Sequence, residues 1–130
     1  MLLFGHRFIQ SESFYHIQDI EAINNTPPSS TIFVEFSEDN LDVIEYLNLN
    51  DINFAVGVKN ITEVIYASNL NASFIVIDKH ISSETQNIAN NYLFDSKILV
   101  SLSNEKEIHN MALLGVDGVI FPNAIVKITT

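Results

Sequence analysis

The chain has 130 residues, of which 16 are Asp or Glu and six are Lys or Arg, so its formal charge is −10 with histidine neutral. Hydrophobic residues make up 47% of it, and it contains no cysteine. These figures favour one folded domain over a disordered chain and argue against nucleic acid as a partner. They also exclude disulfides, thiolate catalysis and cysteine-held zinc or iron–sulfur clusters.

The start of the chain resembles neither a signal peptide nor a membrane anchor. Residues Met1–Phe4 are apolar, but Gly5-His6-Arg7 interrupts them at once. No apolar run approaches the roughly 18 residues that cross a bilayer. We therefore expect a cytoplasmic protein that does not engage a membrane.

Strand and helix signals alternate along the chain. We interpret residues 1–30 as an N-terminal arm with a short helix around Ile17–Ile23, and residues 31–130 as a core of βα repeats in the same domain. A further strand is an option at Leu2–Phe4 or slightly beyond. The five strands expected in the core are Thr31–Phe36, Asn53–Val58, Ser73–Ile77, Lys97–Leu102 and Asp117–Phe121.

The segments between these strands carry helix signals. A polar residue three positions before Glu or Gln indicates capped helix starts at Asn60, Ser83 and Asn104. Gly115 stands where the last helix would end in a left-handed turn. The helix after Ser83 is expected to bury a stripe at helical spacing, formed by Thr85, Ile88, Ala89, Tyr92 and Leu93.

The strand compositions favour a parallel sheet. Ile75-Val76-Ile77 and Val119-Ile120-Phe121 are apolar without alternation, which is typical of parallel strands covered on both faces. The leading interpretation is an α/β fold with an open, mostly parallel sheet of five or six strands flanked by helices, in a flavodoxin-like three-layer arrangement. The alternative is half of a (βα)8 barrel, whose exposed curved face and open edges would call for a dimer.

Ligand sites of parallel sheets lie at the carboxyl ends of the strands, so the polar residues there are the candidates. Glu35 ends an apolar strand and could act as a general base or metal ligand. Asp78 and His80 follow the most hydrophobic strand and are a candidate phosphoacceptor and a candidate acid–base group. The candidate ligand-binding residues are Lys59, Ser101 and Asn123. For such residues the alternative is a solvated or helix-capping side chain.

Other kinds of site find little support in the sequence. No two of the four histidines have a metal-ligand spacing such as i, i+4. Only four glycines occur, and none forms a phosphate-cradling loop. We therefore expect no bound metal and no cofactor.

Two stretches resemble known families. Residues Val34–Asn40, with Asp78, Ser101 and Phe121-Pro122, resemble the acidic turn, phosphoacceptor, hydroxyl residue and final strand end of two-component receiver domains. The resemblance implies a magnesium-dependent phosphoacceptor at Asp78. The lysine that precedes proline in that family is absent, so this would be a degenerate receiver.

The second resemblance is to the central βα units of 2-keto-3-deoxy-6-phosphogluconate aldolase barrels. It rests on Phe54–Val58, Ala72–Val76 and Gly115–Pro122. Glu35 falls near the acid–base glutamate of that family, whereas the Schiff-base lysine would fall at Val119. The resemblance therefore implies a barrel-like architecture without carbinolamine chemistry.

These observations favour a non-enzymatic binding or regulatory module that forms a homodimer, with the arm (Phe4, Phe8, Ile9, Phe14 and Tyr15) as its expected packing or dimer surface. The alternative is a small enzyme that acts on a phosphorylated or carboxylated metabolite with Glu35 as base and Lys59 as anion anchor. Residues 8–58 contain nine acids and no Lys or Arg. The acidic segment 35–51 is therefore a candidate surface for a basic protein partner.

Overall fold

The computed structural model describes residues 1–128. Its strands are β1 (Leu2–Phe4), β2 (Phe14–His16), β3 (Thr31–Glu35), β4 (Phe54–Gly57), β5 (Phe74–Asp78), β6 (Lys97–Ser101), β7 (Gly118–Ile120) and β8 (Ile125–Lys127). Its α-helices are α1 (Leu41–Leu49), α2 (Ile61–Asn69), α3 (Ser82–Asn91) and α4 (Ile108–Leu114). Short 3-10 helices are η1 (Ile20–Asn25), η2 (Glu38–Asn40), η3 (Lys79–Ile81), η4 (Glu105–Glu107) and η5 (Pro122–Ala124).

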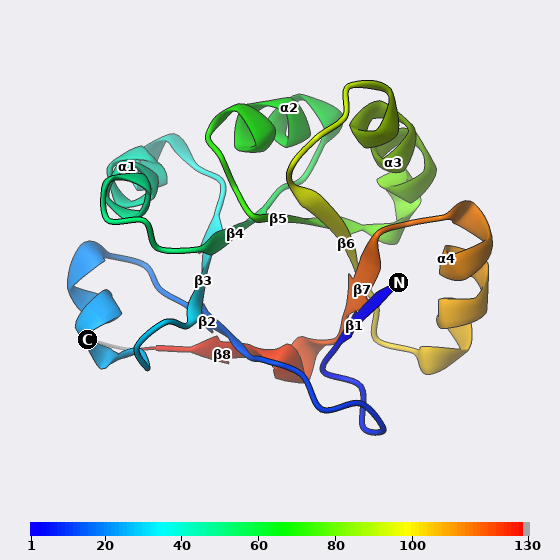
Figure 1. The fold of residues 1–130 in the computed structure, drawn as a ribbon, viewed down its shortest axis with the longest axis horizontal. Helices are drawn as coiled ribbons and strands as arrows, with labels where there is room; N and C mark the ends of the chain where they lie inside the picture. The colour runs from blue at the N-terminus through cyan, green and yellow to red at the C-terminus, as the bar shows by residue number, and fades with distance from the viewer. Residues whose placement is uncertain (129–130) are drawn as a thin grey trace.

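The strands form one all-parallel sheet in the order β1-β7-β6-β5-β4-β3-β2-β8. The sheet is open, with β1 and β8 at its edges, and it curls strongly about a central axis (Figure 1). The expected parallel α/β fold class is therefore confirmed, and the curl is that of the half-barrel alternative. The expected strand number was too low, because residues 1–128 form eight strands and not five or six.

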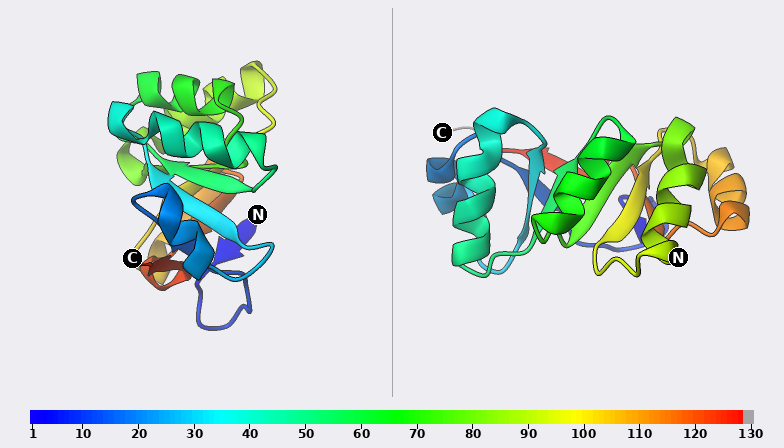
Figure 2. Two further views of the ribbon diagram at one scale, coloured as in Figure 1. Left: turned by 90° about the vertical axis from the view of Figure 1, so that its left-hand side faces the viewer. Right: turned by 90° about the horizontal axis from the view of Figure 1, so that it is seen from above.

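The α-helices lie on the convex side of the sheet, as the views along and across its axis show (Figures 1 and 2). The larger hydrophobic core fills the space between helices and sheet. It takes alternate strand residues, such as Ile32 and Val34 of β3, together with helix residues such as Ile44 and Leu47 of α1. Right-handed crossovers between neighbouring parallel strands place all four helices on one side.

The concave side of the sheet holds a second core. Each of β1 to β7 contributes inward-facing side chains to it, and η5 adds Ala124. Three aromatic rings meet there: the centroid of Phe14 lies 5.0 Å from that of Phe4 and 5.2 Å from that of Phe74. Because Phe4 comes from the β1 edge and Phe14 from β2 near the other edge, their contact holds the curl together.

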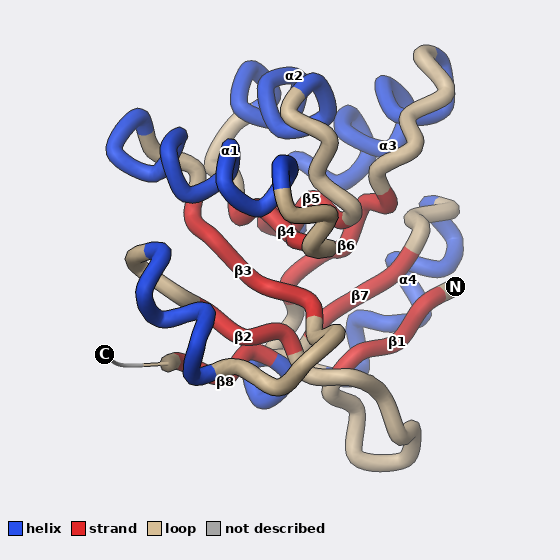
Figure 3. Tube along the Cα trace, turned by 60° about the vertical axis from the view of Figure 1, so that its left-hand side comes forward, coloured by secondary structure: helices blue, strands red, loops and turns tan. Residues whose placement is uncertain are grey.

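The turn after the edge strand β1 also contacts η5, the segment that leads into the other edge strand β8. Gly5 has a φ of +81°, and a Cβ there would lie 2.8 Å from Oδ1 of Asn123 and 2.9 Å from the Cβ of Ala124. Only glycine accommodates both the backbone conformation and this close approach. The tube view shows the curled sheet with β1 and β8 as its two edge strands (Figure 3).

Several expected helix signals are present and others are wrong. Asn60 accepts the backbone N–H of Glu63, Asn104 accepts that of Lys106, and Gly115 is left-handed with a φ of +77°. The box expected at Ser83 and Gln86 is wrong, because the side chain of Gln86 is buried and accepts the backbone N–H of Asp117.

The stripe expected on α3 holds only for its first residues. Thr85 and Ala89 are buried, but Tyr92 and Leu93 lie beyond the last turn of the helix and are exposed. The short helix expected around Ile17–Ile23 starts later, as η1, where Asp19 accepts the backbone N–H of Ala22. Across residues 1–128, each helix is too short or too polar to cross a membrane.

Candidate functional site

Six of the strands have a polar residue or glycine as their last residue, at the carboxyl end of the curled sheet. These strand-final residues are His16, Glu35, Gly57, Asp78, Ser101 and Lys127. We call this set the carboxyl-end ring. Since all strands are parallel, the ring occupies the end of the sheet at which α/β proteins assemble their ligand sites.

The ring residues face the concave side. Side chains alternate along a strand, and the residue two positions before each ring member, such as Phe14, Phe33 or Val76, belongs to the inner core. The register agrees with this placement, since Glu35 pairs with Gly57 and Asp78 pairs with Ser101. The ring therefore forms a polar layer above the apolar inner core.

His16 is the most enclosed titratable group of the ring. It is half-buried, and its ring meets that of Phe33 edge-on, with centroids 5.0 Å apart. Burial lowers the pKa of the imidazole below its ordinary value, the charge of Glu35 opposes this, and the charge of Lys127 adds to it. His16 is therefore neutral at neutral pH and can accept or share a proton.

Glu35 and Lys127 lie on either side of His16. Lys127 pairs with His16 in the β2–β8 register, and Glu35 is on the neighbouring strand β3. Both side chains are exposed, and within residues 1–128 neither forms an ion pair. An anionic group and a cationic group are thus both available to a ligand at this side of the ring.

Asp78 ends β5 and His80 follows in η3, so the strand β4 lies between them and Glu35 of β3. Both are mostly exposed, and His80 Nδ1 lies 4.0 Å from Asp78 Oδ2. Lys79 between them binds Glu107 with an Nζ–Oε2 distance of 2.7 Å. Asp78 belongs to the ring, whereas His80 belongs to η3 and lies outside it.

The structure separates the three expected ligand-binding residues. Ser101 lies in the ring, in register with Asp78. Lys59 follows β4 by two residues, is exposed, and its backbone N–H is bound by the Glu63 carboxylate at the start of α2. Asn123 lies in η5, against Gly5. The three residues therefore do not form one cluster.

Asn123 lines a separate surface pocket of about 610 Å3 beside the ring, together with the turn after β1 and the start of η4. Glu105 closes one side of it, accepting hydrogen bonds from Arg7 Nη2 at 3.0 Å and lying 2.9 Å from His6 Nε2. The Arg7 guanidinium holds the pKa of the Glu105 carboxyl below its ordinary value, so this carboxylate stays ionised and is paired with Arg7. This pocket offers an ion pair already satisfied within the chain.

The ring can bind a ligand through a carboxylate, a hydroxyl, a neutral imidazole and an ammonium group. A metal site has no support: among the described residues, no three His, Asp or Glu side chains are grouped to hold an ion. Acid–base chemistry would use the imidazole of His16, and anion binding would use the ammonium group of Lys127.

The receiver resemblance does not extend to the geometry that it implies, whereas the curled parallel sheet has the barrel-like architecture that the aldolase resemblance implies. Receiver-type sheets reverse their strand order, as in 2-1-3-4-5, whereas β2 to β7 here follow chain order and β4 separates the strands of Glu35 and Asp78. Val119, where an aldolase lysine would fall, packs in the outer core and away from the ring. The sequence matches no protein-family model, and no curated protein matches it.

Sequence reasoning missed two ring residues, His16 and Lys127. Both end three-residue strands that it did not identify. The signals were present but short: Phe14-Tyr15-His16-Ile17 and Ile125-Val126-Lys127-Ile128 are rich in aromatic and β-branched residues. Each run lies beside a loop, and this is why the first was interpreted as part of the arm.

Proposed function

We propose that this protein is a non-enzymatic binding module that takes a small polar metabolite at the carboxyl-end ring. The observation that carries the proposal is the convergence of His16, Glu35 and Lys127 on three adjacent strands, above an apolar core. Lys127 would bind a carboxylate or phosphate of the ligand, and Glu35 would accept hydrogen bonds from its hydroxyl or amino groups.

Solvent access favours binding over catalysis. The side chain of Asp78 is 72% exposed, and Glu35, Ser101 and Lys127 are exposed as well. Enzymes usually exclude water from reacting groups to strengthen the electrostatic interactions there. An open ring holds a ligand by hydrogen bonds and charge and gives it less of that enclosure.

Thermal shift measurements test this proposal with four probes at millimolar concentration: inorganic phosphate, succinate, serine and glycerol 3-phosphate. At least one should raise the melting temperature of the wild type, and Glu35→Gln or Lys127→Gln should reduce that rise. Matched controls are Glu45→Gln on α1 and Lys97→Gln at the amino end of β6, both exposed. A rise unaffected by either ring substitution, or no rise with any probe, would contradict the proposal.

A second candidate function is a small enzyme that removes a proton next to a carbonyl group. It is favoured by the neutral imidazole of His16 between an acid and a cation. Exchange of the methyl protons of pyruvate in deuterated water, followed by proton NMR, would detect it. Exchange faster than without protein, and lost in His16→Gln, would support the enzyme; exchange at the uncatalysed rate would leave the binding module.

The acidic segment 35–51 is also proposed as the surface for a basic protein partner in the cytoplasm. Its acids Glu38, Asp39 and Asp42 are exposed in η2 and at the start of α1. Their charge would attract a basic partner and speed its association. Reversing these three charges should abolish the capture of a basic partner while leaving the melting temperature nearly unchanged.

A further inference from the structure

The four α-helices of the repeat end alike, with one exception. A residue with a positive φ lies one or two positions beyond the last residue of each helix: Asp51 after α1, Asn71 after α2, Leu93 after α3 and Gly115 directly after α4. Asp, Asn and Gly tolerate this left-handed conformation, but leucine does so poorly. Leu93 is also 84% exposed, so neither backbone preference nor burial in the chain explains it.

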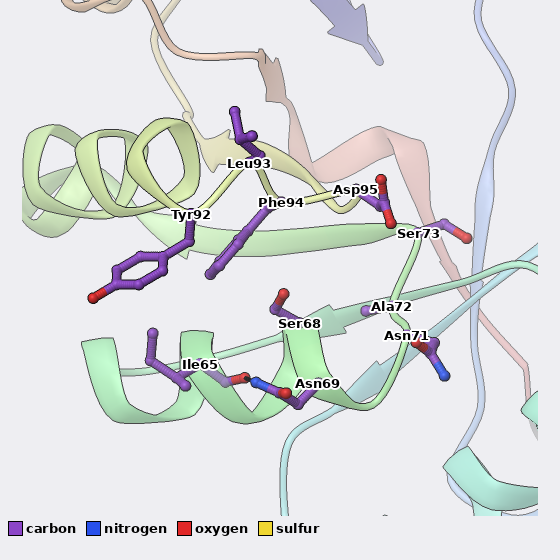
Figure 4. A pocket seen from close by; sticks show the side chains of 10 residues that line it. All are labelled: Ile65, Ser68, Asn69, Asn71, Ala72, Ser73, Tyr92, Leu93, Phe94 and Asp95. Carbon is purple, nitrogen blue, oxygen red and sulfur yellow. Dashed lines mark hydrogen bonds between the residues drawn. The ribbon is translucent and has the colours of Figure 1, made fainter.

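Leu93 stands at the rim of a groove of about 880 Å3 between the last turns of α2 and α3. The groove lies at the amino ends of β5 and β6, opposite the carboxyl-end ring. Figure 4 shows Tyr92 and Phe94 extending toward α2, whereas Leu93 points away from it. Tyr92 is 75% exposed, while Phe94, Ala72 and Ile65 are partly or fully buried and form the apolar part of the lining. The rest of the lining is polar and consists of Ser68, Asn69, Asn71, Ser73 and Asp95.

We propose that this face is the interface of a homodimer, in which Leu93 of each protomer inserts into the α2–α3 groove of the other. A two-fold interface uses the same surface on both chains, so it must contain both a projection and a hollow. This face contains both within a few residues: Leu93 projects at its rim, and Ile65, Ala72 and Phe94 line the hollow beside it.

The charge distribution points to a second copy as the occupant. Two chains of charge −10 repel one another, so they associate where acids are few. Of the 16 acidic residues, only Asp95 lines the groove. The helix starts, by contrast, lie at the opposite edge and carry acids such as Glu38, Asp42, Glu63 and Glu84.

Sedimentation velocity of the full chain tests the interface over a roughly hundredfold range of protein concentration, from about 1 to about 100 µM. We expect a dimer that dissociates on dilution, and Leu93→Asn should raise its dissociation constant at least about tenfold. This substitution removes the projection and supplies a residue type suited to the left-handed backbone, so the fold is retained. Circular dichroism confirms that retention.

Two matched substitutions complete the experiment. Leu113→Asn changes a similarly exposed leucine on α4, outside the groove, and should leave the dimer intact. Phe8→Asn removes the exposed aromatic residue of the N-terminal arm. A monomer at every concentration, a dimer unaffected by Leu93→Asn, or a dimer lost in Phe8→Asn instead would overturn the proposal. If no probe binds at the carboxyl-end ring but the chain still forms the dimer, that result contradicts the proposed function and leaves the dimer proposal standing.

Discussion

The carboxylate of Glu35 lies directly over Gly57, its register partner on β4. A Cβ at position 57 would stand 2.7 Å from Oε2 of Glu35 and 2.8 Å from Cζ of Phe33. Because Gly57 has no side chain, the carboxylate of Glu35 and the aromatic ring of Phe33 can lie side by side over it.

Gly57→Ala should therefore destabilise the fold by about 1–3 kcal/mol, as overpacking of a filled core does. The Glu35 side chain can swing toward solvent, but the Phe33 ring is buried and must shift. Urea denaturation measures the loss. The double variant Gly57→Ala/Phe33→Leu should lose less free energy of unfolding than the sum of the losses of the two single variants. Strictly additive losses would show that the phenyl ring of Phe33 does not clash with the new methyl group.

Gly115→Ala is expected to act through the backbone alone. A Cβ there would meet nothing within 4 Å, but the φ of +77° is unfavourable for alanine. The expected loss is about 1–2 kcal/mol, the cost of a left-handed residue. Gly115→Asn, which tolerates this conformation better, should recover part of it in the same urea measurement. Equal losses for both substitutions would contradict the backbone explanation.

The pH dependence of stability should report the burial of His16. Because its pKa is lowered in the folded chain, the unfolded chain binds more protons as the pH falls below the ordinary histidine value of about 6.5. The contribution of His16 is then fully present above that pH and is lost as the pH falls toward the folded pKa. Urea midpoints between about pH 5 and 8 measure this, and His16→Gln should flatten the curve.

His80→Gln is the matched control, since His80 is exposed and outside the ring. Its pH profile should follow that of the wild type. NMR titration of the His16 ring gives an independent measurement: Lys127→Gln should raise its pKa by removing a repelling cation, and Glu35→Gln should lower it further. Shifts in the reverse directions would mean that these charges do not face the imidazole.

The sequence predicted the parallel βα core because its strands are uninterrupted apolar runs. Glu35, Asp78 and Ser101 were placed at strand ends for the same reason, since each directly follows such a run. Local patterns of this kind depend on residues close in the chain, and parallel order follows from the helices between the strands.

The curl of the sheet and two of the six ring residues could not be predicted in this way. His16 and Lys127 meet only because β2 and β8, more than 100 residues apart, pair with one another. The contact of Phe4 with Phe14 likewise depends on where the two edges of the sheet finish. Tyr92 and Leu93 fit a helical stripe by spacing, but α3 ends at Asn91, so the stripe stops before them.

The N-terminal arm provides the last prediction, because its aromatic residues divide sharply. Phe14 is fully buried in the inner core between Phe4 and Phe74, whereas Phe8 is 71% exposed and stacks with Arg7. Phe14→Ala should cost about 3–5 kcal/mol, the loss typical of a buried aromatic residue. Phe8→Ala should cost less than about 1 kcal/mol, since an exposed cation–π contact contributes little.

Urea denaturation of the two variants at one protein concentration decides whether the arm is part of the fold. If residues 14–16 form a strand of the sheet, losing the Phe14 ring opens a cavity between its two edges and weakens the contact that holds the curl. Similar small losses for both variants would instead show that the arm is peripheral. His16 would then have no fixed place opposite Lys127, and the carboxyl-end ring would lose both of them.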